Sequence, residues 1–390
     1  MKILHVSPSY YPAIKFGGPI RSVHELNKSL VSKGVHVEVI TTDAGIDKDQ
    51  KIIINSWQQV ENVKVKYFSF IGYEHYNFSL PLFFALFFNV KKYDLVHITA
   101  VWNFPVWAAS FCCNLFGIPY IISPRGTIYP ETIALKSTNL KKLYYQLVAK
   151  RCLEKASYIH FTSDDEAESV VKHLKLKTKY QVIANGIDLN AFQKSSEHPI
   201  THYFPDLTGK EYLFFIGRIH PKKGLDILYQ AFAKVIKVYP DLKLVIAGPD
   251  NDGYKAELVA LSNHLNISNS IIYTDNIEGD AKKAAFQGAS MFLLSSYSEN
   301  FGMTVIESLA MACPIIISNK VGIAPNIESN HAGKVVQVDE NELSEAIIEL
   351  KHNPSQKELY IKNGLTLVKN QFSIDSVSNS FIELYRKIVK

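Results

Sequence analysis

Residues 212–228 read YLFFIGRIHPKKGLDIL, and this stretch indicates how the second half of the chain folds. A short apolar run fits a buried strand, Gly217 turns the chain, and an amphipathic helix pattern begins at Gly224. Arg218 follows the strand directly and Lys223 precedes the helix. Cations beside a helix start suit a diphosphate, because both attract anions. A solvated basic turn is the alternative, which is weaker here because Arg218 directly follows a buried strand.

Short apolar runs alternate with helix-like segments on both sides of this stretch. At the start of the chain, Lys2–Ser7 fits a buried strand and Pro19–Lys33 carries apolar residues at helical spacing. This alternation favours parallel sheets with helices on both faces, as in Rossmann-like α/β domains. Residues 194–210 break the alternation, because KSSEHPITHYFPDLTGK is polar and contains two prolines and a glycine.

We therefore expect two α/β domains joined by a linker within residues 194–210. The first spans residues 1–195 and the second residues 206–372, and a length of 390 residues agrees with two domains. Ligands of parallel sheets bind beyond the carboxyl ends of the strands, so a cleft between two facing domains is the expected site.

The composition excludes a disordered chain, because 47% of the residues are hydrophobic and 12% are aromatic. The net charge of +5 is unevenly spread. Residues 1–195 hold 23 Lys and Arg against 15 Asp and Glu, giving +8, and residues 196–390 hold 19 against 22, giving −3. This excess is too diffuse for a nucleic-acid-binding element, so we expect no nucleic-acid partner and different ligands for the two halves.

Cysteine usage and hydropathy indicate a protein of the reducing cytoplasm. Cys112, Cys113, Cys152 and Cys313 form no CxxC pair and fit buried thiols. The N-terminal apolar run is too short for a signal peptide and fits a first strand. The longest apolar run, Phe78–Val90, has 13 residues and contains a proline, against about 20 needed to span a bilayer. We expect no transmembrane helix.

Gly17 and Gly18 lie between the first strand and the first helix. Paired glycines let backbone N–H groups approach an anion closely, and the helix start behind them favours negative charge. A simple turn explains the pair equally well. The chain has no GxGxxG here, which disfavours a dinucleotide-dependent dehydrogenase.

A third candidate loop lies in SSYSENFGMTVIESLAMACP, between an apolar run and a helix. Glu299 precedes residues 300–303, whose backbone N–H groups face the carboxyl end of the strand. Glu307 falls in the second turn of the helix. A carboxylate can hold sugar hydroxyls, and a helix start can hold phosphate. An exposed helical position is the alternative for Glu307, and its apolar neighbours argue against it.

At these residues the chain resembles the retaining nucleotide-sugar glycosyltransferases of family 4, which have the two-domain GT-B fold. The resemblance covers essentially the whole chain and rests on segments in a fixed order. They are FGGPIRSVHEL at 16–26, FTSDDE at 161–166, ANGID at 184–188, GRIHPKKGLDIL at 217–228, IAGPD at 246–250 and SENFGMTVIE at 298–307. The resemblance implies an acceptor-binding first domain and a donor-binding second domain. It also implies that a C-terminal helix within 373–390 packs back on the first domain.

The resemblance implies a role for each matched residue. Arg218 and Lys223 would hold the donor diphosphate, Glu299 would contact the transferred sugar, and these three would carry the catalysis. Glu307 would hydrogen-bond the ribose hydroxyls. Further donor contacts would come from Gly17 and Gly18, from the backbone N–H groups of Asn300, Phe301, Gly302 and Met303, and, more loosely, from Asn276 and Ile277 at the base pocket.

The chain departs from the family near the implied reaction centre. Many relatives carry a histidine after the strand that corresponds to Tyr120–Ser123, and Arg125 stands there in this chain. A guanidinium cannot act as a base, but it can bind phosphate, an acceptor carboxylate or a hydroxyl. His97 is a second candidate on the acceptor side, and a structural histidine at a strand end explains it equally well. No catalytic base is assigned.

The implied reaction needs no metal and no bound cofactor, because a UDP- or GDP-sugar is the co-substrate. Negative charge grows on the departing phosphate oxygen, where fixed cations and the helix start after Gly302 can stabilise it. Same-face attack would retain the anomeric configuration.

Two triplets, at 47–49 and 250–252, match the metal-binding pattern DxD. Asp and Asn are frequent turn residues, so we interpret both triplets as loops.

The acceptor is expected to be a glycan or a lipid-linked molecule that meets the basic first domain. The apolar run Phe78–Val90 and the basic segment Lys136–Lys155 could together touch an anionic bilayer. A buried core helix and a solvated helix face explain the same segments. Because many relatives extend lipid-linked surface polysaccharides, the resemblance implies an enzyme of lipopolysaccharide, capsule or exopolysaccharide biosynthesis, cytoplasmic and peripheral on the inner face of the membrane.

Two other functions remain open. A sugar-nucleotide epimerase of GT-B type would share the fold and the diphosphate site, and the acceptor-sized loops of the first domain argue against it. A non-catalytic nucleotide-sugar-binding protein belongs to a different class, and the complete set of Arg218, Lys223, Glu299 and Glu307 argues for activity. The sequence identifies neither the sugar nor the base of the donor.

Overall fold

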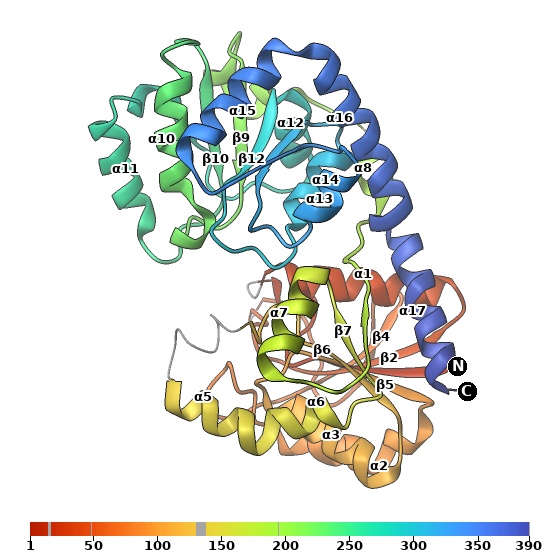
Figure 1. The fold of residues 1–390 in the computed structure, drawn as a ribbon. Helices are drawn as coiled ribbons and strands as arrows, with labels where there is room; N and C mark the ends of the chain where they lie inside the picture. Colours follow the sequence, from red (N-terminus) through yellow and green to blue (C-terminus); the bar gives the residue numbers. More distant parts are fainter. Residues whose placement is uncertain (15–16, 48, 130–137, 194, 390) are drawn as a thin grey trace. The chain divides into compact units, whose positions relative to one another are not determined.

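The computed structural model describes residues 1–14, 17–47, 49–129, 138–193 and 195–389. The chain forms two compact α/β units, which are Met1–Gly186 with Ile374–Lys390, and Ile187–Ser373. Each unit is built around a sheet covered by helices (Figure 1). The expected class of two parallel-sheet α/β domains is confirmed.

The described residues of the first unit form an eight-stranded sheet in the order β3-β4-β2-β1-β5-β6-β7-β8. Strand β3 runs antiparallel to β4, and the other pairs are parallel. The central strand β5 is buried along its whole length, as expected where helices cover both faces. The strands are β1 Lys2–Val6, β2 His36–Thr42, β3 Trp57–Val60, β4 Val63–Phe68, β5 Leu95–Thr99, β6 Tyr120–Ser123, β7 Tyr158–Phe161 and β8 Tyr180–Val182.

Two apolar cores flank this sheet. In one core, α1 Gly18–Ser32 packs beside the C-terminal helix α17 Ile374–Val389, which contributes Phe381 and Tyr385 (Figure 1). The other core lies under α2 Leu80–Asn89 and α3 Phe104–Phe116. The remaining helical elements are Val90–Lys92, α5 Thr138–Tyr144, a π-helical stretch at Tyr145–Ala149, α6 Lys150–Glu154 and α7 Asp164–Leu174.

The described residues of the second unit form a six-stranded parallel sheet in the order β11-β10-β9-β12-β13-β14. The strands are β9 Tyr212–Ile216, β10 Lys243–Ala247, β11 Ile271–Tyr273, β12 Met291–Leu294, β13 Ile315–Ser318 and β14 Lys334–Val336. The helical elements are α8 Leu189–Gln193, α9 Ile200–Tyr203, Pro205–Leu207, Pro221–Lys223, α10 Leu225–Val235, α11 Tyr254–His264, Ser268–Ser270, α12 Gly279–Gly288, α13 Met303–Ala310, α14 Ala324–Ser329, α15 Glu340–His352, α16 Pro354–Leu367 and the π-helical Val368–Phe372.

The chain divides earlier than the sequence predicts. The predicted first domain ends at 195, whereas the first compact unit ends at Gly186 and resumes at Ile374. The segment predicted as linker belongs to the second unit, because Ile200 and Leu207 are buried and α9 contacts α12. Position 186 requires glycine because the C-terminal segment passes close to it. A Cβ at this position would lie 2.9 Å from the Cα atom of Ile374.

Candidate functional site

In the second unit, three loops meet at the carboxyl ends of neighbouring strands. They follow β9, β12 and β13, which are adjacent in the sheet. The backbone N–H of Tyr297 donates to the carbonyl of Lys222 at 2.9 Å, and the N–H of Glu299 donates to the carbonyl of Lys320 at 3.0 Å. These bonds fix residues that are far apart in the sequence at one edge of the sheet, where ligands of parallel sheets bind.

Lys223 and Glu299 lie against one another across two of these loops. Lys223 Nζ donates a hydrogen bond to Glu299 Oε2, and the two side chains are 19% and 20% exposed. Gly224 holds the backbone beside them in the left-handed region at φ +63°, where a Cβ would lie 2.1 Å from the carbonyl oxygen of Ser295. The loops therefore present a paired, half-buried cation and carboxylate at the strand ends.

The helix α13 begins four residues after Glu299. Gly302 precedes it at φ +91° and, as a glycine, has no side chain with which to cap the first N–H groups. The buried ring of Phe301 packs edge-on against Phe372, with 5.8 Å between ring centroids, and Asn300 and Met303 are half-buried. A helix start without a side-chain cap favours an anion, because its N–H groups and its dipole both point positive charge outward.

Glu307 is held by a lysine that sequence reasoning did not identify. Lys282 on α12 places its Nζ 2.6 Å from Glu307 Oε2, and both side chains are largely buried. No motif surrounds Lys282 in the sequence, so only the folded structure reveals the pair. A carboxylate oriented in this way can accept hydrogen bonds from ligand hydroxyls with its other oxygen.

The remaining predicted donor residues are more peripheral. Arg218 is exposed directly after β9, in a loop tied to the end of β10 by the N–H of Ile219, which donates to the carbonyl of Pro249 at 2.9 Å. Asn276 is exposed and Ile277 is buried after the edge strand β11, two strands away from β9. The described contacts do not join either residue to the Lys223–Glu299 pair.

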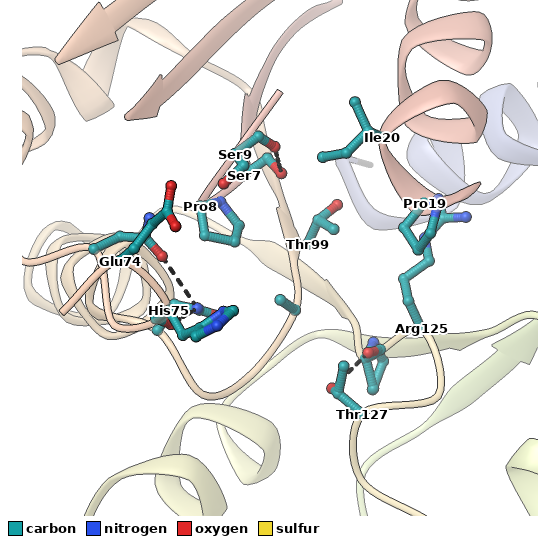
Figure 2. A pocket seen from close by; sticks show the side chains of 14 residues that line it. Ser7, Pro8, Ser9, Pro19, Ile20, Glu74, His75, Thr99, Arg125 and Thr127 are labelled. Atoms are coloured by element: carbon teal, nitrogen blue, oxygen red, sulfur yellow. Dashed lines mark hydrogen bonds between the residues drawn. The ribbon is translucent and has the colours of Figure 1, made fainter. Parts of the chain in front are cut away.

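The first unit contains its own pocket, of about 180 Å³, at the carboxyl ends of β1, β5 and β6 (Figure 2). The start of α1 contributes Pro19 and Ile20 to the wall, directly after Gly17 at φ +87° and Gly18. Residues 15 and 16 of the predicted glycine motif lie outside the described residues. The other lining residues are Ser7, Pro8, Ser9, Glu74, His75, Asn77, Thr99, Ala100, Asn103, Pro124, Arg125 and Thr127.

Arg125 is the cation of this pocket. It is 9% exposed and adopts φ +55°, which is unusual for a residue with a side chain. Its Nη1 donates to Asn185 Oδ1, and it lies 3.4 Å from Ser22 Oγ. Burial lowers the pKa of Arg125 to about 10, so the guanidinium remains charged at neutral pH. Glu74, His75 and Asn185 also belong to this region and were not among the predicted site residues.

His97 does not line this pocket, so its assignment as an acceptor-side residue is replaced by a structural role. Its ring is fully buried, with Nδ1 2.6 Å from the hydroxyl of Tyr385 and Nε2 2.6 Å from Ser123 Oγ. Burial holds the pKa of His97 well below its usual range. The histidine therefore joins the C-terminal helix to the sheet as a neutral hydrogen-bonding group.

Neither DxD triplet forms a metal site among the described residues, where no group of three His, Cys, Asp or Glu side chains is suited to an ion. Asp250 instead caps α11, because its carboxylate accepts the backbone N–H groups of Tyr254 at 3.0 Å and Lys255 at 3.2 Å. The triplet at 47–49 includes position 48, which lies outside the described residues.

Two family matches together cover nearly the whole chain. Residues 16–191 match the family described as Glycosyltransferase Family 4, and residues 204–366 match Glycosyl transferases group 1. With two parallel-sheet units and loops converging at the strand ends, this defines the class as GT-B glycosyltransferases. The chain belongs to the group 1 glycosyltransferases of family 4.

Curated relatives are distant. The chain is 24% identical to the alpha-monoglucosyldiacylglycerol synthase of Streptococcus pneumoniae, over 98% of this chain and 87% of the relative. It is 23% identical to the O-antigen chain mannosyltransferase C of Escherichia coli, over 100% and 99%. In alignments with two mycobacterial D-inositol 3-phosphate glycosyltransferases, the chain spans only about half of the relative, 55% and 57%.

A solved structure shares the fold. Anabaena HepE in complex with UDP superposes with a TM-score of 0.78 at 16% identity, over 99% of this chain and 100% of that chain. The same protein has also been solved with UDP-glucose, and that structure superposes with a TM-score of 0.76. At this level of identity the likeness establishes the GT-B fold alone.

Proposed function

We propose that this chain transfers a sugar from a nucleotide-diphosphate sugar to a hydroxyl of a glycan or lipid-linked acceptor. The observation that carries the proposal is the convergence of Lys223, Glu299 and the start of α13 at one edge of the second sheet. A UDP- or GDP-sugar fits this set, because it offers a diphosphate for the cations and sugar hydroxyls for the carboxylate. HepE, which shares the fold, has been solved with UDP-glucose, and this supports the same donor class.

The proposed reaction is metal-independent and retains the anomeric configuration. The bond between the anomeric carbon and the diphosphate oxygen breaks, and the acceptor oxygen bonds to that carbon from the same face. The diphosphate keeps the electron pair of the broken bond, and its oxygen can take the proton of the acceptor hydroxyl. Arg218, Lys223 and the N–H groups at the start of α13 stabilise the growing charge, which lowers the barrier to departure.

We further propose that the enzyme works in surface polysaccharide biosynthesis, in the cytoplasm, at an anionic membrane. Of the described residues, no helix combines the length and apolarity needed to cross a bilayer. The first unit instead exposes Phe84 and Phe88 on α2, which are 52% and 71% exposed, and Phe111 and Leu115 on α3. Phe83 links the two helices, with ring centroids 5.7 Å from Phe84 and 6.1 Å from Phe111.

A basic helix borders this apolar surface. A groove of about 380 Å³ is lined by Phe111 and Leu115 from α3 and by Leu147, Arg151 and Lys155 from the next helical segment. Apolar side chains beside cations fit the interface of an anionic bilayer, where rings enter the headgroup region and cations meet phosphates. This arrangement supports a peripheral membrane contact.

The test separates transfer from its two alternatives. A thermal-shift panel of UDP-, GDP- and ADP-sugars identifies the donor, because a ligand that binds only the native state raises its melting temperature. Nucleotide release is then measured with and without acceptor glycans. A transferase releases nucleotide in an acceptor-dependent way, an epimerase needs no acceptor, and a binding protein releases none. Unchanged transfer in both Arg218→Ala and Glu299→Ala would refute the site.

A further inference from the structure

Arg125 is a buried cation that no carboxylate neutralises directly. Among the described residues, its hydrogen-bond partners are the neutral groups of Asn185 and Ser22, and its Nε is buried without a partner. The charge of Glu166 raises the pKa of Arg125, but the Glu166 oxygens accept hydrogen bonds from the backbone N–H groups of Gly126 and Thr162 and from the Thr162 hydroxyl. The guanidinium therefore keeps hydrogen-bonding capacity that the protein does not use.

The buried histidines around Arg125 do not compensate this charge. His5 and His160 lie fully buried nearby, and burial lowers the pKa of each to about 3, so both are neutral at pH 7. The charge of Arg125 itself contributes to these shifts. A buried cation whose hydrogen-bond partners are all neutral is costly, and such groups concentrate where a ligand supplies the missing charge.

The pocket beside Arg125 is shaped to receive an anion at one end. Figure 2 shows the Arg125 side chain reaching toward Pro19 at the start of α1, with Glu74 on the opposite side of the pocket. The helix α1 has 15 residues, and its positive end adds to the charge of Arg125. Glu74 lines the same pocket, and its Oε1 accepts a hydrogen bond from the backbone N–H of Gly45 at 3.0 Å. A carboxylate in this position can accept hydrogen bonds from hydroxyls of a ligand.

We propose that Arg125 binds a phosphate or carboxylate of the glycosyl acceptor, so that the acceptor is an acidic molecule. The inference rests on the proposed transferase function and names the substrate class of its acceptor site. The donor diphosphate has the same anionic chemistry but its own cations, Lys223 and Arg218, in the second unit. All lining residues of the Arg125 pocket belong to the first unit. A guanidinium binds such anions with two parallel hydrogen bonds, which also orients the acceptor hydroxyl.

The first test uses inorganic phosphate and methyl phosphate as probes of the intact protein. All three tryptophans, at 57, 102 and 107, lie in the first unit, and Trp102 Nε1 donates to the carbonyl of the pocket residue Thr127 at 2.7 Å. We expect a saturable change in tryptophan fluorescence, at least tenfold weaker in Arg125→Gln and partly restored in Arg125→Lys. Arg218→Gln is the matched control and should respond as the wild type does. An equal response of wild type and Arg125→Gln overturns the proposal.

A second variant keeps the test decisive if Arg125→Gln folds poorly. Asn185→Asp puts a carboxylate on the atom that Arg125 already contacts, so it supplies the counter-ion from within the protein. We expect a higher melting temperature and at least tenfold weaker phosphate binding. Undiminished phosphate binding in Asn185→Asp contradicts the assignment, because a neutralised guanidinium should no longer attract the probe.

Measuring donor binding in the absence of acceptor determines whether the donor or the acceptor supplies the anion that Arg125 binds. If the acceptor supplies the acid group, Arg125→Gln leaves the affinity for the nucleotide sugar within about twofold of wild type and raises the KM of an acidic acceptor at least tenfold. A tenfold loss of donor affinity instead assigns Arg125 to the donor diphosphate and overturns the acceptor role. Failure of every nucleotide sugar to bind the wild type refutes the proposed function, whereas normal donor binding without a phosphate response refutes only this inference.

Discussion

Cations at the candidate sites of the two units are held in opposite ways. In the second unit, Lys223 is paired with Glu299, and Lys282 is paired with Glu307. In the first unit, Arg125 is buried among neutral hydrogen-bond partners, and its buried Nε has no hydrogen-bond partner. Residues 196–390, with a net charge of −3, thus contain these neutralised cations, whereas residues 1–195, with a net charge of +8, contain the one without a directly bonded carboxylate. Net charge does not indicate where an anion is needed.

This difference indicates how each cation would bind its ligand. A diphosphate that binds at Lys223 must share or replace the contact with Glu299, and that carboxylate is then free to accept sugar hydroxyls. The paired arrangement positions both groups before the ligand arrives, which reduces the reorganisation needed in the transition state. Arg125 needs no exchange, because its unused nitrogen already lacks a partner.

The largest expected effect is on catalysis. Lys223→Ala removes the cation at the strand ends, and we expect the transfer rate to fall about 10²–10³-fold, as for loss of one fixed donor to a developing negative charge. The measurement is kcat/KM with saturating acceptor. Lys222→Ala is the control, because this neighbouring lysine is exposed and should change the rate less than threefold. A Lys223→Ala enzyme within fivefold of wild type would contradict the role.

The second prediction concerns the stability of the loop that carries Lys223. Gly224→Ala adds a Cβ at φ +63°, 2.1 Å from the carbonyl oxygen of Ser295, so the loop must shift. We expect the second unit to lose about 3 kcal/mol of unfolding free energy, from backbone strain and this clash. Gly253→Ala is the control, with a similar φ of +77° but nothing within 4 Å of the added carbon. Calorimetry should show a markedly smaller loss for the control, and equal losses would contradict the steric explanation.

Much of the fold follows from the sequence because apolar periodicity is a local signal. The strands at Tyr120–Ser123 and Tyr212–Ile216 have the predicted bounds. The antiparallel edge strand β3, WQQV, was missed because it is half-buried and lacks an alternating apolar pattern. The helix α16 was missed because its apolar residues are spread around its circumference. Tertiary packing determines which strands pair and where a weakly amphipathic helix forms. A single sequence does not display this packing.

The candidate site was predictable only where a motif carried it. Lys223 and Glu299 follow strands and flank helices, so strand topology alone brings them to one edge of a sheet. Lys282 and Asn185 reach their partners through helix packing and chain crossing, for which no local pattern exists. For His97 the sequence left two interpretations open, because a histidine at a strand end gives no indication of whether it faces a pocket or the core.

The third prediction concerns the buried histidines of the first unit. His160 donates from Nε2 to the carbonyl of Ile183 at 2.8 Å, and Nδ1 lies 2.7 Å from Ser123 Oγ. Burial lowers its pKa from 6.5 to about 3, so below pH 6.5 the unfolded chain takes up a proton that the native protein does not. Stability is therefore present above pH 6.5 and is lost as the pH falls, by about 2 kcal/mol for His160 between pH 7 and pH 5.

His160→Gln tests this pH-dependent contribution to stability, because the amide can keep hydrogen bonds but does not titrate. Urea unfolding is followed by tryptophan fluorescence, which reports the first unit alone. We expect the pH 7 to pH 5 loss to be smaller by about 2 kcal/mol than in the wild type. His173→Gln, at an exposed position on α7, should keep the wild-type loss. Identical pH dependence in all three proteins would mean that His160 is already protonated in the native state.

The smallest effect concerns the membrane, and it extends the comparison to the surfaces of the two units. Phe84→Ser with Phe88→Ser removes two exposed rings from α2, and we expect about tenfold weaker partitioning onto phosphatidylglycerol vesicles. Leu359→Ser with Leu365→Ser is the matched control, since these exposed apolar residues lie on α16 of the second unit and do not line the groove with Arg151 and Lys155. Binding should weaken as salt rises and should be slight on phosphatidylcholine, because the cations at Arg151 and Lys155 need an anionic surface. If both pairs lower vesicle binding equally, adhesion is a general property of exposed apolar residues, and the basic character of the first unit serves the acidic acceptor alone.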